Sequence, residues 1–339
     1  LCKQAEILSN KYAVVCTNPP YMNKLERHLK DFVVTYYKAY SGDLFSVFMY
    51  RNFGFCKENG YSAFMLPNVW MFIKTYENLR NYILNEKSIV SLIQMAKGAF
   101  FKEATVDICT FILKNAQETE KGLYFRLEDF KGDMEVQKQK VLEALADKNC
   151  GYFYETDQSN FSKIPGTPVA YWASQNILNA FGNKTLGMIA EPKVGLQTGE
   201  NNRFTRIWYE ILFDKFKVDA NSDNDALNSR KKWFPYNKGG EFRKWYGNNE
   251  FVVNWEHGGV ELRQFEGSVL RNSSYYFKEC FSWSLISSSV AAFRYKPAGQ
   301  IFDVAGMSCF ASEKELNYLL ALCNTKVVMK ILEVISPTI

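Results

Sequence analysis

Hydrophobic residues in the first third of the chain fall into short runs separated by turn-forming residues. Residues 11–16 form an apolar, β-branched run that stops at Asn-Pro-Pro, which predicts a buried strand ending in a rigid loop. Asp43 occupies the N-cap position of an apolar helical stretch that extends to about Lys57, where the turn 58–60 ends it. The run 61–66 predicts the next strand.

The pattern continues with a helix at about 76–84 and two strands at 89–95 and 106–113, which are joined by the loop 96–105. Strands that alternate with helices are typical of an α/β layered domain. A parallel sheet with an antiparallel hairpin at one edge fits this order of elements.

The pattern loosens beyond about Lys114. Residues 131–148 are charged and predict a helix, and residues 150–170 are rich in aromatic residues, Ser, Asn and Pro, which suits a connecting segment. Short β-like runs broken by Gly, Asn and Pro occupy 186–303, and a helix is expected at about 313–334. This second region is therefore expected to be a mostly β domain with a C-terminal helix.

Composition excludes several classes of protein. The net charge of +5, from 41 basic and 36 acidic residues, is too small to identify a nucleic-acid-binding protein by itself. No run approaches the ~18 apolar residues of a membrane span, so no membrane association is expected. Eight scattered cysteines without a C-x-x-C pair, together with two histidines, predict no metal site and reduced thiols in a cytoplasmic protein.

The loop after the first strand carries the most informative residues, Asn18-Pro19-Pro20-Tyr21. An exocyclic amino group is a poor nucleophile because its nitrogen lone pair is delocalised into the ring. The amide oxygen of Asn18 and the carbonyl of Pro19 could accept both amino hydrogens and free that lone pair, and the prolines would aim the carbonyl in advance. Tyr21 offers an aromatic face to a flipped base. A Pro-Pro turn without chemistry is the alternative.

This tetrapeptide after a strand resembles the hallmark motif of amino-methyltransferases, in the Asn-first form typical of adenine-N6 enzymes. Similar segments follow in order at 43–45, 59–67 and 101–106. The chain resembles in particular PglX-type methyltransferases of bacterial BREX phage-defence systems and large restriction-modification methyltransferases. The resemblance covers nearly the whole chain and includes 151–154, 233–240, 242–247 and 302–306.

The resemblance implies a site-specific DNA methyltransferase that moves a methyl group from S-adenosylmethionine to N6 of a flipped adenine. The implied fold is of the α/β class: the second half of a Rossmann-like methyltransferase sheet over 1–130, a connection over 131–185, and a mostly β target-recognition domain with a C-terminal helix over 186–339. Phe101 would contact the flipped base together with Tyr21. A core aromatic residue in a β-turn is the alternative for Phe101.

The sequence departs from the family at the cofactor. The family places a Gly-rich motif and an acidic ribose-binding residue before the Asn-Pro-Pro-Tyr strand, whereas residues 1–17 contain no such motif. The glycines of 195–199 lie in the β-like region, where a backbone turn is expected. Because the chain also opens on Leu1 rather than Met, it is expected to be the substrate-facing fragment of an enzyme. Such a fragment should bind S-adenosylmethionine poorly and be inactive alone.

A basic segment at 230–245 predicts contact with double-stranded DNA. It holds six basic residues against one acidic residue, a local charge of +5, with Trp233, Tyr236 and Trp245 between them. A solvated loop anchored by its aromatic residues is the alternative. The candidate contacts are Lys231, Lys232, Asn237, Lys238, Arg243 and Lys244, with Arg203, Arg206 and Arg294 as weaker candidates that could equally be surface or packing residues.

Two other functions stay open at this point. A methyltransferase acting on a protein glutamine or on RNA would share the Asn-Pro-Pro-Tyr motif, although the large basic region exceeds what a peptide loop requires. A specificity module could also bind DNA without modifying it. Other subunits of a defence or restriction system are further expected partners.

Overall fold

The computed structural model describes residues 2–100, 106–286 and 290–335 of the chain. These residues group into two compact units that divide between Asn183 and Lys184. The end of the last helix, from Val334, groups with the first unit. The two are called the N-terminal unit and the C-terminal unit below.

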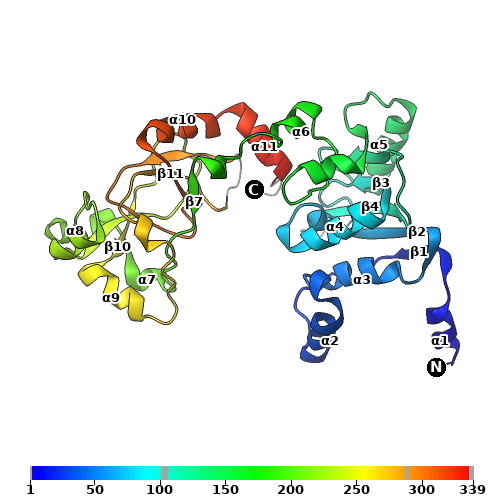
Figure 1. The fold of residues 1–339 in the computed structure, drawn as a ribbon, viewed down its shortest axis with the longest axis horizontal. Coiled ribbons are helices and arrows are strands. Elements are labelled where there is room, and N and C mark those ends of the chain that lie inside the picture. Colours follow the sequence, from blue (N-terminus) through cyan, green and yellow to red (C-terminus); the bar gives the residue numbers. More distant parts are fainter. Residues whose placement is uncertain (1, 101–105, 287–289, 336–339) are drawn as a thin grey trace. The chain divides into compact units, whose positions relative to one another are not determined.

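A mixed six-stranded sheet organises the N-terminal unit (Figure 1). The strand order across this sheet is β1-β2-β4-β3-β5-β6. β1 pairs with β2, and β3 pairs with β5, in parallel, whereas the other neighbouring strands are antiparallel. The strands are β1 (Tyr12–Thr17), β2 (Cys56–Pro67), β3 (Ser88–Gln94), β4 (Ile108–Lys114), β5 (Gly122–Arg126) and β6 (Phe153–Thr156).

The hairpin of β3 and β4 lies in the middle of this sheet, so the prediction that it forms one edge is wrong. β5 pairs with the other side of β3, and β6, from the segment expected to be a connection, pairs with β5. These two strands contain only five and four residues. Their hydrophobic alternation is too short to distinguish them from the loops around them.

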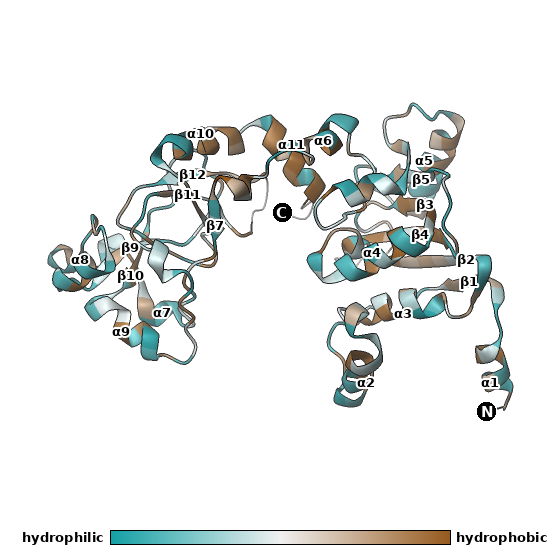
Figure 2. Cartoon of the chain, viewed as in Figure 1, coloured by the Kyte–Doolittle hydropathy of each residue, from teal (hydrophilic) through white to brown (hydrophobic). Residues whose placement is uncertain are grey.

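Helices pack on the sheet and bury its apolar residues. Leu79 and Ile83 of α4 are fully buried in one cluster with Leu92 of β3 and Phe111 of β4. Figure 2 shows hydrophobic residues concentrated in the strands that form this core. The helices of the N-terminal unit are α1 (Cys2–Ser9), α2 (Arg27–Tyr37), α3 (Leu44–Asn52), α4 (Glu77–Glu86), α5 (Met134–Ala146) and α6 (Gln175–Ala180).

α3 begins where the sequence predicts, with Asp43 as its N-cap, but it ends earlier than expected. Its last residue is Asn52 rather than about Lys57, because β2 starts soon afterwards. The predicted turn at 58–60 lies inside β2, where Asn59 has a φ of 59° and the register against β1 shifts. An Asn at this position tolerates the left-handed conformation that the irregularity requires.

The C-terminal unit contains two four-stranded sheets, in the orders β13-β9-β10-β8 and β12-β11-β14-β7. The first sheet contains β8 (Thr205–Ile207), β9 (Trp233–Asn237), β10 (Phe251–Asn254) and β13 (Ile301–Phe302), and the second contains β7 (Glu191–Lys193), β11 (Cys280–Ser282), β12 (Arg294–Lys296) and β14 (Ser308–Phe310). The helices that accompany them are α7 (Asn201–Phe204), α8 (Asp223–Asn228), α9 (Glu256–Gln264), α10 (Glu313–Cys323) and α11 (Lys326–Ile335).

The single helix predicted at about 313–334 is in fact two helices, α10 and α11, with Asn324 at the break. The Asn324 amide nitrogen donates to the carbonyl of Phe293 at 2.9 Å, and its amide oxygen accepts from the Phe293 N–H at 3.2 Å. This side chain therefore ties the end of α10 to the strand region of the unit. Within the described ranges, every helix is too short or too polar to cross a lipid bilayer.

Candidate active site and nucleic-acid interface

The Asn-Pro-Pro-Tyr loop follows the carboxyl end of β1, next to the parallel strand β2. Thr17, the last residue of β1, is paired with Phe64 of β2. In open α/β sheets, ligands bind at the carboxyl ends of the strands. Asn18 and Pro20 are exposed there, whereas Pro19 is buried. The loop thus presents the Asn18 side chain to solvent on a fixed base.

The Tyr21 hydroxyl holds the amide of Asn18. It donates to Asn18 Oδ1 at 2.7 Å and lies 3.1 Å from the carbonyl oxygen of Met65 in β2. One hydroxyl hydrogen serves one acceptor well, and the shorter distance favours Asn18. Burial raises the pKa of Tyr21, with a smaller effect of Cys109, so the hydroxyl remains a donor at neutral pH. The Asn18 acceptor oxygen is therefore occupied by Tyr21.

Asp43 fixes the other end of the loop. Its Oδ1 accepts from the backbone N–H of Met22 at 2.8 Å and from that of Phe45 at 3.1 Å, in the first turn of α3. The N–H of Leu44 donates in turn to the Met22 carbonyl at 3.0 Å. One buried carboxylate thus both caps α3 and anchors the loop that carries Asn18. The sequence identifies the helix cap but does not reveal the contact with Met22.

The loops that follow β1 and β2 contain no glycine. Glycine is absent from 18–26, after β1, and from 68–76, after β2, so neither loop offers a Gly-rich turn for a bound nucleoside. These loops therefore do not fit S-adenosylmethionine by themselves. Among the described residues, no group of three or more His, Cys, Asp or Glu side chains could hold a metal ion. Phe101 lies outside the described residues.

Two candidate DNA-contacting residues are buried in the C-terminal unit and form hydrogen bonds within it. Asn237 is 1% exposed, and its amide nitrogen donates to the Gly306 carbonyl at 3.1 Å and to Ser308 Oγ at 3.2 Å. Arg294 is also 1% exposed, and its guanidinium donates to Ser284 Oγ at 3.0 Å. Both side chains hold strands and loops together. Neither is therefore part of the DNA interface that we propose.

The remaining basic candidates differ in how many contacts their charged groups make within the protein. Lys232 forms an ion pair with Glu256 at 3.5 Å, and Lys244 Nζ donates to the Asn324 carbonyl at 3.2 Å. Lys238 is half-buried, with its ammonium 5.3 Å from the ring centre of Phe251. Burial lowers the pKa of Lys238. Each of these lysines has a role within the fold.

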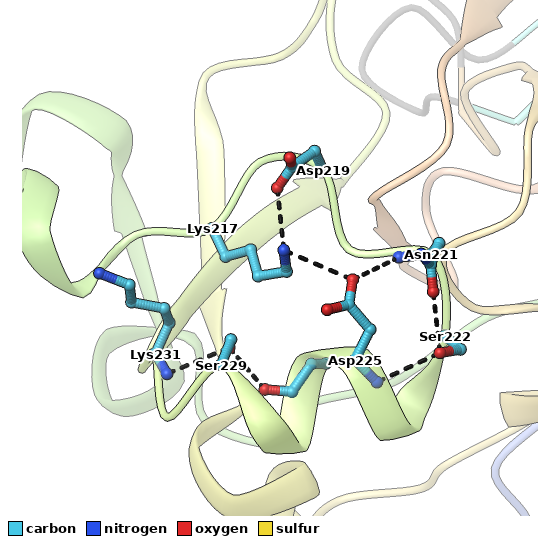
Figure 3. Close-up of polar contacts among 8 residues, drawn as sticks. Lys217, Asp219, Asn221, Ser222, Asp225, Ser229 and Lys231 are labelled. Atoms are coloured by element: carbon cyan, nitrogen blue, oxygen red, sulfur yellow. Dashed lines mark hydrogen bonds and ion pairs between the residues drawn. The ribbon is translucent and has the colours of Figure 1, made fainter.

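Lys231 lies beside a network of polar contacts around α8 (Figure 3). The ammonium of Lys217 forms ion pairs with Asp219 and Asp225, at 3.0 and 3.4 Å. Figure 3 shows the Lys231 side chain extending away from these carboxylates, and its ammonium donates to the Asp214 carbonyl. Lys217 is therefore neutralised locally by two carboxylates. Lys231 forms no ion pair within the described residues, although its ammonium, like that of Lys244, donates to a backbone carbonyl.

Arg203 and Arg206 pack against aromatic rings. The Arg203 guanidinium lies 5.0 and 5.3 Å from the ring centres of Phe204 and Phe265. Arg206 donates to the Asn202 carbonyl at 2.6 Å and lies 5.7 Å from the ring centre of Trp233. Arg203 is exposed and Arg206 is half-buried, so packing accounts for part of each side chain.

The loop over residues 239–249, between β9 and β10, is held by hydrogen bonds from a buried lysine and exposes aromatic side chains. Buried Lys296 donates to the carbonyls of Gly247 and Asn248 and to Asn249 Oδ1, at 2.9, 2.7 and 2.7 Å. Burial lowers the pKa of Lys296 to about 7. The exposed aromatic residues of this 239–249 loop are Phe242, Trp245 and Tyr246, at 52%, 54% and 61%. Its charged Glu241 and Arg243 are also exposed, and Arg243 forms an ion pair with Glu250 at 3.4 Å.

Sequence reasoning includes Trp245 and Arg243 in the basic segment but misses Phe242, Tyr246 and the anchoring role of Lys296. Three aromatic residues within five positions of a Gly-containing basic segment would have been the signal for exposed rings. Lys296 gives no such signal, because it lies far along the chain in a short strand.

The chain is similar to known restriction-modification and DNA methyltransferase proteins. Residues 3–101 match the family model of the Eco57I restriction-modification methylases. The chain is 37% identical over 354 residues to the adenine-specific methyltransferase PglX of Lacticaseibacillus casei (strain Zhang), covering 100% of this chain and 29% of that protein. It is 35% identical over 347 residues to the adenine-specific methyltransferase BrxX of Escherichia coli O9:H4 (strain HS), covering 99% and 27%.

The fold is also similar to that of a solved restriction enzyme. The structure of the Type IIL restriction-modification enzyme MmeI in complex with DNA superimposes with a TM-score of 0.57 at 13% identity. This match covers 91% of the present chain and 42% of that chain, and at such low identity it concerns the fold alone.

The N-terminal segment of the chain is thus similar to the Eco57I restriction-modification methylases. Over its whole length it is a homologue of the adenine-specific methyltransferases PglX and BrxX. The chain spans less than a third of the length of these two relatives, 29% and 27%.

Proposed function

We propose that the chain supplies the base-side half of the active site of an adenine-specific DNA N6-methyltransferase. The observation that carries the proposal is the Asn18 amide oxygen, exposed at the end of β1 and held as an acceptor by Tyr21. When bound, S-adenosylmethionine would supply the methyl group. The residues of this chain would prepare the amino group that receives it.

The amino group of a flipped adenine would take the place of the Tyr21 hydroxyl at Asn18 Oδ1. A second amino hydrogen would be accepted by the Pro19 carbonyl, whose position the two prolines restrict. With both hydrogens engaged, the nitrogen becomes more tetrahedral and its lone pair turns out of the ring plane. Preorganised acceptors of this kind lower the barrier without rearranging during the reaction.

Tyr21 has two separable roles in this proposal, and two substitutions separate them. Tyr21→Phe keeps the ring and removes the competing hydroxyl, so kcat/KM for DNA should stay within about fivefold of the wild type, since a neutral hydrogen bond contributes about 1 kcal/mol. Tyr21→Ala removes the stacking surface and should lower kcat/KM by about tenfold or more, since stacking on a base contributes roughly 1–3 kcal/mol.

Exposed Tyr36 on α2 provides the matched control, because its ring packs against Phe32 of the same helix, with ring centres 4.9 Å apart. The activity of Tyr36→Ala should equal that of the wild type. Equal losses of kcat/KM in Tyr21→Phe and Tyr21→Ala would show that the Tyr21 ring does not stack on the base. Steady-state methylation of a duplex substrate is the measurement.

We also propose that the C-terminal unit binds double-stranded DNA through the 239–249 loop and Lys231. The loop combines the exposed Arg243 with three exposed rings, and Lys296 fixes its backbone before DNA arrives. Cationic side chains bind phosphates, and planar side chains contact sugars and base edges. Other subunits of a defence or restriction system are proposed partners of the complete protein.

Arg243→Ala tests this interface. The substitution should weaken binding to all duplex sequences alike and reduce the magnitude of the salt slope of log K by about 1, as expected for a phosphate contact. Arg263→Ala, an exposed arginine of α9 in the same unit, should leave both quantities unchanged. Fluorescence anisotropy across a salt series measures both. An unchanged affinity in Arg243→Ala would exclude Arg243 from the interface.

A further inference from the structure

A recess lies at the amino ends of strands in the six-stranded sheet, whereas Asn18 follows the carboxyl end of β1. It has a volume of about 760 Å³ and is lined at the amino ends of three strands, by Lys11 before β1, Cys56 of β2 and Lys87 before β3. β1 contains six residues, so at ~3.3 Å per residue the recess is roughly 20 Å from the Asn-Pro-Pro-Tyr loop. The candidate catalytic loop therefore plays no part in it. Pockets of this size hold small organic ligands.

The recess carries a concentrated positive charge. Four cations line it, Lys11, Arg51, Lys57 and Lys87, against one carboxylate, Glu58. In the described part of the chain, none of the four cations forms an ion pair. Converging cations without carboxylate partners in a concave site create a strong local positive potential. An anion is the complementary ligand.

The fold holds three of these cations at the wall. The Lys11 ammonium donates to the Gly54 carbonyl. The Arg51 guanidinium lies 4.2 Å from the ring centre of Phe55 and flat against Gly54, where an added Cβ would be 2.2 Å from Arg51 Nη1. Lys87 Nζ lies 5.0 Å from the ring centre of Phe53. The guanidinium in this position thus occupies the space that a side chain at position 54 would need.

Aromatic rings form the remaining wall. Tyr50 stacks on Tyr40 with ring centres 4.3 Å apart and an interplanar angle of 22°, and its ring centre is 5.0 Å from that of Tyr82. Tyr37 meets Tyr50 edge-on at 6.2 Å. Tyr37, Tyr50 and Tyr82 all line the recess. A planar ring can pack against such a wall while the cations hold a negatively charged group.

We propose that this recess binds a nucleotide, with its phosphates on Arg51, Lys57 and Lys87 and its base against the tyrosine wall. Arg51 binds phosphate oxygens in a planar fork, and the lysines act as point charges. The ligand is either a free nucleotide or one nucleotide of a nucleic-acid strand, since both carry the same phosphate and ring.

Calorimetric titration of the full chain tests the proposal, with adenosine diphosphate, adenosine, pyrophosphate and a short single-stranded oligonucleotide as probes. Adenosine diphosphate should bind more tightly than adenosine and than pyrophosphate. Lys57→Glu and Arg51→Glu should each weaken its binding by about tenfold or more, as expected for lost charge-assisted hydrogen bonds. Lys121→Glu, at an exposed lysine outside the recess, should change it by less than about twofold.

Lys57 and Arg51 are exposed, so these variants should melt like the wild type, and melting curves verify it. Tyr50→Ala should weaken the binding of adenosine diphosphate, which has a base, but not the binding of pyrophosphate, which has none. Oligonucleotide binding that is tighter than that of the diphosphate, and that Lys57→Glu and Arg51→Glu weaken, would assign the site to a nucleic-acid strand. Diphosphate binding that these variants weaken, with oligonucleotide binding that they leave unchanged, would assign it to a free nucleotide. Absence of binding, or binding insensitive to Lys57→Glu and Arg51→Glu, would overturn the proposal. Asn18→Ala should leave these affinities unchanged, which separates this site from the methyl-transfer site.

Discussion

Asn18→Ala in the complete gene product is expected to lower the rate of DNA methylation by about 10²-fold or more while leaving DNA affinity within about twofold. Preorganised hydrogen-bonding groups at a reacting atom contribute on this scale. The alanine side chain cannot accept an amino hydrogen, so the adenine nitrogen keeps its lone pair in the ring. Single-turnover methylation and anisotropy with the same duplex give the two quantities.

Asn23→Ala is the matched control, because Asn23 is an exposed amide five residues further along the same loop. Its methylation rate should stay close to that of the wild type. If Asn18→Ala retained the wild-type rate, the assignment of Asn18 as the acceptor of the amino group would fail. If it lost DNA binding as well, Asn18 would act in binding rather than in the reaction.

Arg80→Ala is expected to destabilise the N-terminal unit by about 3 kcal/mol. Arg80 is 1% exposed and donates to the carbonyls of Trp70 and Ile73, each at 2.8 Å, and to that of Gly166 at 2.7 Å. Burial lowers the pKa of Arg80 to about 10, so the guanidinium stays charged at neutral pH. Its removal leaves buried carbonyls without donors and a cavity between α4 and the segment at Gly166.

Urea denaturation of the full chain, followed by circular dichroism, measures this loss of unfolding free energy. Arg27→Ala on the exposed surface of α2 provides the control and should change the free energy by less than about 0.5 kcal/mol. A loss below about 1 kcal/mol in Arg80→Ala would contradict the structural role. Arg80 gives no sign of this role in the sequence, where it looks like any other arginine on a helix.

Local patterns predict the elements that carry the candidate active site. The apolar run before Asn18 is β1, Asp43 caps α3, and the runs near 61–66 and 89–95 are β2 and β3. Each of these depends on neighbouring residues alone, which is why the sequence reveals them. The place of the hairpin in the sheet depends on β5 and β6, which pair with it from much later positions.

Burial is what the sequence could not supply for the basic segment. Asn237 and Arg294 have the residue types of DNA contacts, yet their polar groups bind Gly306, Ser308 and Ser284 inside the unit. The contact between Tyr21 and Asn18 was equally invisible, because it depends on the loop folding back toward β2. Residue type therefore predicts the chemistry available at a position, and tertiary packing decides whether it can be used.

The measurement that tests the central claim most directly is identification of the methylated group. Duplex DNA, a glutamine-containing peptide and RNA are incubated with the complete gene product and S-adenosylmethionine carrying a labelled methyl group, and the products are digested and analysed by mass spectrometry. We predict label in N6-methyladenine from the DNA, and its loss in Asn18→Ala. Label in the peptide or the RNA alone, or on a cytosine of the DNA, would contradict the proposed function.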